Sequence, residues 1–115
     1  MTLDAYHAQL AEIRGRFAAR IAERVARLRE IEGGLAHDDA ARDEMHRTLH
    51  DIAGTAPSLG FEALGAEARR VEMMIAGAIK PARSFTADEL AEIDSGLRLL
   101  AREAEQLHAS AATNS

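Results

Sequence analysis

Two histidines lie one helical turn apart in a stretch that also holds an unusually placed glycine. His46 and His50 are four residues apart, and Gly54 follows after four more. At about 100° per residue, His50 lies roughly 140° and Gly54 roughly 180° from the centre of the apolar stripe of this stretch. We therefore expect His50 and Gly54 to face solvent, with His46, about 100° away, at the border of the stripe. The stripe consists of Met45, Leu49, Ile52, Ala56 and Leu59.

An exposed imidazole is a competent nucleophile at neutral pH, because a large share of it is unprotonated. Gly54 in a helix costs roughly 1 kcal/mol relative to alanine. Close approach of another molecule beside His50 is one reason for a glycine at this position.

The two histidines also have the i,i+4 spacing that can chelate zinc from one helix. However, Arg47 stands where the H-E-x-x-H motif has glutamate, and no third ligand stands out in the sequence. No metal site is therefore predicted, and a small metal-binding bundle that uses His46 and His50 is kept as an alternative function.

The segment from His50 to Gly60 resembles the signature of histidine-containing phosphotransfer (HPt) domains. In that family the histidine is followed by a hydrophobic residue, a lysine, a glycine, a small residue and a second glycine at fixed positions. Ala53 stands where the lysine is usual, and Pro57 is unusual inside the helix. The matching residues are Ile52, Gly54, Ala56 and Gly60.

The resemblance implies that His50 accepts a phosphoryl group and that the chain is a phosphocarrier rather than an enzyme. It would relay the group between receiver-domain aspartates in a multistep phosphorelay. The implied partners are response-regulator receiver domains and a hybrid sensor histidine kinase. No cofactor is expected on this chain, since Mg²⁺ belongs to the receiver. A non-phosphorylated helical adaptor that sequesters a receiver domain is the alternative, because the lysine is absent.

Arg47 lies about one turn before His50 and has two interpretations: stabilisation of phosphoryl oxygens, or an ordinary solvated surface arginine. Asp43 and Asp51 flank the same surface, where a solvated helix face is favoured over an acid–base role. The binding surface expected around His50 comprises Asp43, His46, Asp51, Ala53, Gly54 and Pro57.

The composition of the 115-residue chain suits one domain of packed helices, with 47% hydrophobic and 3% aromatic residues. The net charge of −5 argues against a nucleic-acid partner, and the lack of cysteine excludes disulfides and thiolate chemistry. No apolar run approaches the roughly 18 residues of a membrane span, and no signal-peptide pattern follows Met1. We expect a cytoplasmic monomer with no membrane partner.

Four amphipathic stretches predict an all-α, antiparallel up-down four-helix bundle. The first covers residues 3–31, with an apolar stripe that begins at Leu3, Tyr6, Leu10 and Ile13, and Gly33-Gly34 ends it. The second begins after a cap at Asp38 or Asp39 and kinks or ends early at about Pro57. The third covers residues 61–79, and a loop over 80–85 follows. The capping box at residues 86–89 starts a fourth helix that ends near His108. Residues 1–109 form the predicted domain and 110–115 a flexible tail.

Overall fold

The described part of the chain is helical. The computed structural model describes residues 2–79 and 83–113, and no strand occurs within those ranges. This confirms the predicted all-α class. The elements are α1 (Leu3–Ile31), the 3-10 turn η1 (Glu32–Gly34), α2 (Asp39–Thr55), the 3-10 turn η2 (Pro57–Leu59), α3 (Glu62–Ile79) and α4 (Ala87–Thr113).

Side-chain caps explain where three of these helices begin. The Thr2 hydroxyl accepts a hydrogen bond from the backbone of Ala5 at the start of α1. Asp38, one of the two predicted caps, accepts from the backbone of Ala40 at the start of α2. The predicted capping box of α4 is also confirmed, because Thr86 and Glu89 bond each other's backbone N–H at 3.1 and 2.9 Å.

Pro57 determines the end of α2. The helix ends at Thr55, as predicted for a chain that meets proline, and η2 carries it to Gly60. Gly60 has φ +88°, a left-handed conformation that glycine adopts without a Cβ penalty. The proline ring then lies against Gly65 of α3, where an added Cβ would be 2.7 Å from Pro57 Cγ. This contact brings the start of α3 close to the end of α2.

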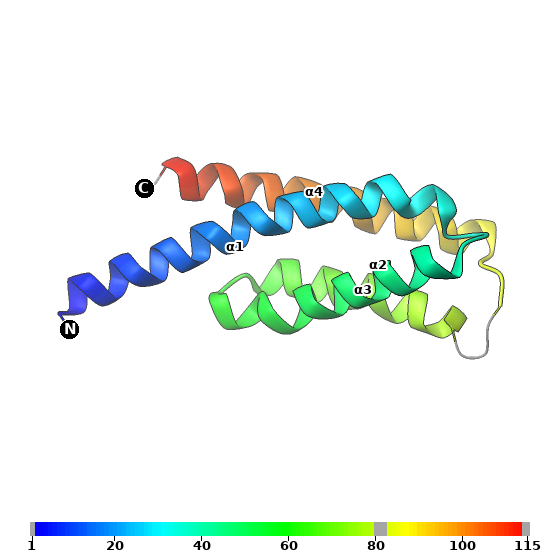
Figure 1. Cartoon of the computed structure of the whole chain (residues 1–115), viewed down its shortest axis with the longest axis horizontal. Helices are drawn as coiled ribbons and strands as arrows, with labels where there is room; N and C mark the ends of the chain where they lie inside the picture. The colour runs from blue at the N-terminus through cyan, green and yellow to red at the C-terminus, as the bar shows by residue number, and fades with distance from the viewer. Residues whose placement is uncertain (1, 80–82, 114–115) are drawn as a thin grey trace.

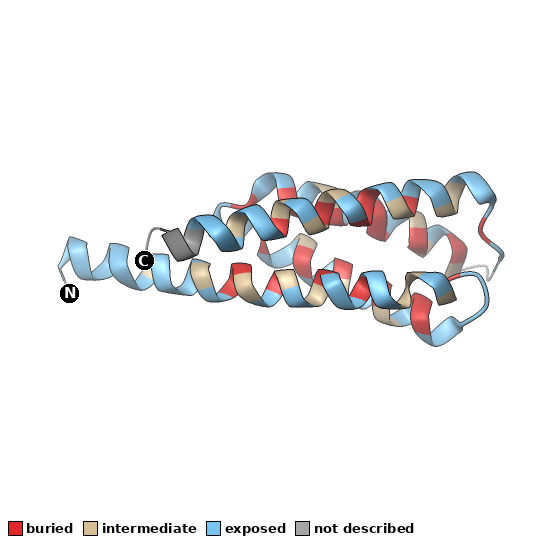
Figure 2. Ribbon diagram, turned by 90° about the horizontal axis from the view of Figure 1, so that it is seen from above, coloured by how far each residue is buried: buried red, intermediate tan, exposed pale blue. Residues whose placement is uncertain are grey.

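The helices pack as two pairs around one core. α1 lies along α4 and α2 lies along α3, and α3 also packs against α4 (Figure 1). The buried faces of the helices point toward one another (Figure 2), so the apolar stripes meet inside. Fully buried core residues include Ile21, Leu28, Met45, Leu49, Ile52, Leu64, Ile75, Ile93, Leu97 and Leu100.

The N-terminal part of α1 projects beyond α2 and α3 (Figure 1). Its apolar stripe is therefore exposed at the start: Leu3, Tyr6 and Ile13 are 69%, 52% and 43% exposed. Burial on α1 begins only at Phe17. The length of a periodic stripe thus overestimates how much of this helix lies in the core.

The predicted end of the fourth helix near His108 is wrong. α4 continues to Thr113, through a segment with alanine at 109, 111 and 112, and alanine is the best helix former. The predicted tail over 110–115 is therefore helical as far as Thr113, and residues 114 and 115 lie outside the described residues.

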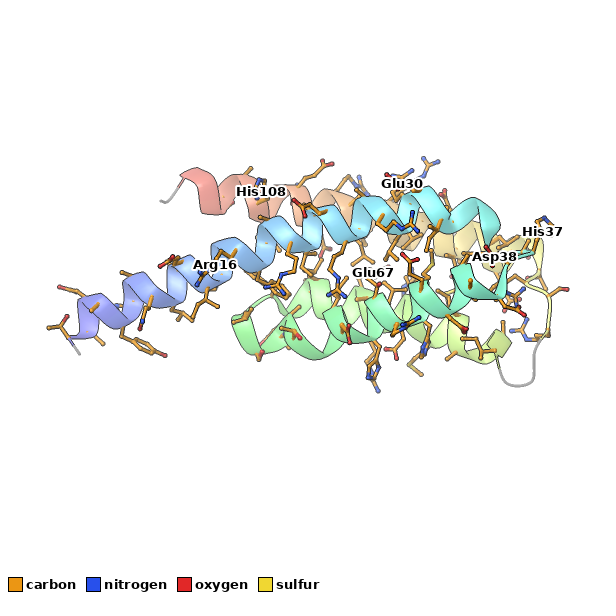
Figure 3. All side chains as sticks on the ribbon, viewed as in Figure 1. Arg16, Glu30, His37, Asp38, Glu67 and His108 are labelled. Atoms are coloured by element: carbon orange, nitrogen blue, oxygen red, sulfur yellow. The ribbon has the colours of Figure 1, made fainter. Side chains whose placement is uncertain are left out.

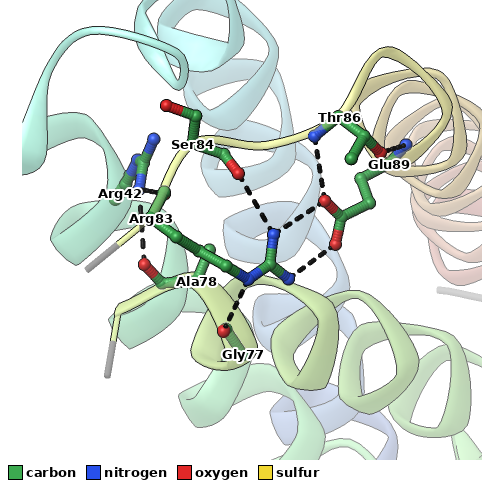
Figure 4. Close-up of polar contacts among 7 residues, drawn as sticks. All are labelled: Arg42, Gly77, Ala78, Arg83, Ser84, Thr86 and Glu89. Atoms are coloured by element: carbon green, nitrogen blue, oxygen red, sulfur yellow. Dashed lines mark hydrogen bonds and ion pairs between the residues drawn. The ribbon is translucent and has the colours of Figure 1, made fainter. Parts of the chain in front are cut away.

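A buried arginine closes the opposite end of the molecule. Arg42 of α2 donates to the carbonyls of Leu35 and Arg83 at 2.7 and 2.6 Å, and its guanidinium lies over the Phe85 ring. Arg83 in turn pairs with Glu89 (Figure 4), and these hydrogen bonds, followed by one from the Thr86 backbone, lower the pKa of Glu89 to about 2. Residues 80–82 of the predicted loop lie outside the described residues.

Candidate functional site

His50 points away from the core, as its position on the helix predicted. Its side chain is 65% exposed. Gly54, one turn further along α2, is also exposed, and nothing would lie within 4 Å of an added Cβ there. The surface of α2 one turn beyond His50 is therefore open to solvent.

A carboxylate of α3 holds the inner side of this ring. His50 Nδ1 lies 2.7 Å from Glu72 Oε1, and the Glu72 side chain is only 10% exposed. Sequence reasoning missed Glu72, although a signal was present. Glu72 follows Ala68 by four residues and precedes Ile75 by three, so it occupies the predicted buried stripe of its helix. A carboxylate in such a stripe calls for a partner.

The contact with Glu72 decides which nitrogen of the His50 ring remains free. A carboxylate can only accept, so Nδ1 must carry the proton that it donates to Glu72. In a neutral ring the lone pair then resides on Nε2. Because Nδ1 is engaged with a buried group while the ring is largely exposed, Nε2 is the nitrogen available to an incoming electrophile.

His46 lies beside His50 on the same carboxylate. Its Nε2 is 3.6 Å from Glu72 Oε1, an ion pair when His46 is protonated, and its side chain is 34% exposed. The two imidazole rings are stacked, with centroids 6.2 Å apart. His46 is thus the border residue that the sequence predicted. Glu72 Oε2 is buried without a hydrogen-bond partner in the described structure.

The remaining histidines do not join this site. Figure 3 places His37 at the end where α1 and α2 connect and His108 on the C-terminal part of α4. His7 lies in the first turns of α1, with its ring centroid 5.8 Å from that of Tyr6. Within residues 2–79 and 83–113, no three His, Asp or Glu residues are grouped as a metal site.

A protein-family model matches this chain. The Hpt domain model covers residues 12–110, which include all of α2, α3 and the His50–Glu72 pair. The chain belongs to the Hpt domain family. The family indicates histidine phosphotransfer in phosphorelay signalling, and its members are phosphocarrier modules rather than classical enzymes. Comparisons with curated proteins and with solved structures gave no match.

The surface residues predicted around His50 divide between two sides of the Hpt domain. Asp51 faces α1, where its Oδ2 lies 3.3 Å from Arg24 Nη2. Ala53 is half-buried on the side of α3, close to Gly65, and Pro57 is exposed with its ring against Gly65. Asp43 and Arg47 are exposed. The structure therefore brings His46, His50 and Ala53 to the α2–α3 edge and directs Asp51 elsewhere.

A surface groove of about 310 Å³ lies between α1 and the end of α2. Its apolar lining includes Ile13, Phe17 and Leu59, and its polar lining includes Arg20, Arg24 and Asp51. The Arg24–Asp51 ion pair lies in this lining. The groove thus adjoins the α2 turn that carries His50.

Among the described residues, no helix is long and apolar enough to cross a bilayer.

Proposed function

We propose that His50 is the phosphoryl acceptor of this Hpt domain and that the chain relays the group between receiver-domain aspartates in a multistep phosphorelay. The observation that carries the proposal is the 2.7 Å contact between His50 Nδ1 and the buried Glu72. It leaves Nε2 as the free nucleophile on an exposed ring, beside the open space at Gly54.

The transfer step follows from this geometry. Nε2 of His50 attacks the phosphorus of an aspartyl phosphate on the donor receiver, in line with the bond that breaks. The N–P bond forms as the P–O bond to aspartate breaks, and the electron pair of that bond returns to the receiver carboxylate. The ring gains positive charge, which the Glu72 carboxylate stabilises through Nδ1–H. The reverse step delivers the group to the second receiver, and the receivers supply Mg²⁺.

The course of the helices supports the proposed topology. The α1–α2 connection and the α2–α3 connection lie at opposite ends of α2, and α4 begins at the end where α2 begins (Figure 1). This course supports the antiparallel up-down four-helix arrangement.

A receiver on the His50 face would reach both the α2–α3 edge and the groove beside Asp51. We propose a cytoplasmic monomer that meets receiver domains and a hybrid kinase in turn.

The test is transfer of radiolabelled phosphate from phosphorylated receiver domains of the same organism to three forms of the chain. The wild type should acquire acid-labile label, His50→Gln none, and His46→Gln a reduced amount. Glutamine approximates the size and polarity of imidazole without its nucleophilic nitrogen, and circular dichroism checks that each variant keeps its helicity.

Three outcomes would count against the proposal. Label on His50→Gln, or its loss from His46→Gln alone, would place the acceptor elsewhere. A wild type that binds receivers and takes no label would favour the adaptor function, for which Ala53 in place of the family's usual lysine is the supporting observation.

A further inference from the structure

The phosphoryl group that the proposed function places on His50 needs a cation that α2 does not provide at the usual position. Ala53 has no charge, and it stands where the resemblance to HPt domains leads one to expect lysine. Two exposed arginines are candidates: Arg47, three residues before His50 on α2, and Arg69, three residues before Glu72 on α3.

The contacts between α2 and α3 place Arg69 beside the His50 turn. Gly65 packs against Pro57 and the backbone of Ala53. A Cβ added at Gly65 would be 2.7 Å from the Pro57 ring and 3.6 Å from the Ala53 carbonyl oxygen. Further along α3, Glu72 reaches His50 at 2.7 Å. Arg69 lies between Gly65 and Glu72, and its backbone is therefore level with the segment from His50 to Ala53.

The position of Arg69 around the α3 axis places its side chain on the solvent-exposed rim of the α2–α3 edge, where His46, His50 and Ala53 lie. Gly65 and Glu72 are buried against α2, whereas Arg69, about 40° and 60° away from them around α3, is exposed. Ala53 lies about 60° from His50 toward α3. Packed helix axes are roughly 8–10 Å apart. A long side chain from Arg69 can thus cross above Ala53 toward the solvent side of the His50 ring.

Arg69 has no competing partner within the described part of the chain, where no ion pair or hydrogen bond engages its side chain. Its neighbour Arg70 differs, since it is paired with Glu67 and Glu92 at 2.7 and 3.4 Å. A guanidinium without a carboxylate partner is available to bind a dianion.

Arg47 is placed less well for the same role. It lies about 60° from His50 on the side toward α1, away from α3. Its charge acts on Glu44, whose pKa is lowered first by its hydrogen bond to Arg27 and further by the charges of Arg27 and Arg47. Part of the attraction of Arg47 is thus directed to a carboxylate of its own helix.

We propose that Arg69 contacts the phosphoryl oxygens on Nε2 of His50 and supplies from α3 the charge that the family's lysine would supply from position 53. This inference rests on the proposed role of His50. A guanidinium presents paired N–H donors that match two phosphoryl oxygens, so it stabilises both the transferring group and the phosphohistidine.

Arg69→Ala tests this inference with two matched variants. Loss of a charge-assisted contact should slow transfer from a phosphorylated receiver by about tenfold or more and shorten the lifetime of isolated phosphohistidine. Arg47→Ala should have a smaller effect on both. Ala53→Lys, introduced into Arg69→Ala, should restore most of the rate, because the new ammonium returns a charge to the same edge.

Affinity for the unphosphorylated receiver, measured by calorimetry, separates phosphoryl contact from docking and should not change in Arg69→Ala. The inference is overturned by a wild-type transfer rate in Arg69→Ala, by loss of receiver affinity that accounts for the slowing, or by no restoration with Ala53→Lys. Failure of the proposed function is a different result, since it would appear as an unlabelled wild type or a labelled His50→Gln.

Discussion

The Glu72 carboxylate lies 2.7 Å from Nδ1 of His50, and the Glu72 side chain is only 10% exposed. A carboxylate so far from water is costly unless it is paired. Oε1 of Glu72 contacts both His50 and His46, whereas Oε2 has no hydrogen-bond partner among the described residues. The orientation of the His50 ring is thus set by α3, the neighbouring helix, and not by α2 alone.

Glu72 variants should separate ring orientation from folding. Glu72→Ala removes the acceptor for Nδ1–H, so the ring should populate both tautomers and several orientations, and phosphotransfer should slow by about tenfold or more. Glu72→Gln keeps an oxygen acceptor and should retain more of the rate. Nitrogen chemical shifts of His50 report the tautomer directly. An Ala variant with an unchanged tautomer and rate would remove Glu72 from the mechanism.

The helices could be predicted from the sequence because their signals are local. Apolar spacing, the Asp38 cap, the capping box at Thr86 and the proline at Pro57 each act within a few residues. The end of α4 was misplaced because small polar residues resembled a tail, whereas alanines carried the helix to Thr113.

The site was only half predictable, because its two halves come from different helices. The exposure of His50 and the space at Gly54 follow from rotation around α2 alone. The pairing with Glu72 depends on the register between α2 and α3, which the contact of Pro57 with Gly65 helps to fix. The same limit applies to Asp51, whose partner Arg24 lies 27 residues away on α1.

Gly54 and Gly65 should respond in opposite ways to the same added methyl group. Gly54→Ala meets nothing within 4 Å and should raise helix stability by about 1 kcal/mol. Gly65→Ala would place Cβ 2.7 Å from Pro57 Cγ and should destabilise the fold by about 1–3 kcal/mol. Urea unfolding of the two variants measures both effects.

The same pair tests the use of the space beside His50. If a receiver approaches closely at Gly54, the more stable Gly54→Ala variant should transfer more slowly despite its intact fold. Equal transfer rates for Gly54→Ala and the wild type would show that the open space is not part of the docking surface.

Glu32, at the end of α1, should make stability depend on pH near neutrality. Burial, and then a hydrogen bond and charge repulsion from Asp94, raise the pKa of Glu32 from 4.5 to about 7, against the opposing charges of Arg29 and Arg98. Because the folded state binds this proton more tightly than the unfolded state, the contribution is fully present below pH 4.5 and is lost as pH rises toward 7.

Glu32→Gln replaces the acid with a neutral group that does not titrate. Its free energy of unfolding should therefore fall less than that of the wild type between pH 4.5 and 7, the interval set by the two pKa values. Glu30→Gln, which alters an exposed glutamate paired with Arg27 at 3.6 Å, is the matched control and should follow the wild-type curve over this interval. Urea midpoints at several pH values give the slopes. Parallel curves for Glu32→Gln and the wild type would show that the Glu32–Asp94 pair does not share its proton in the folded state.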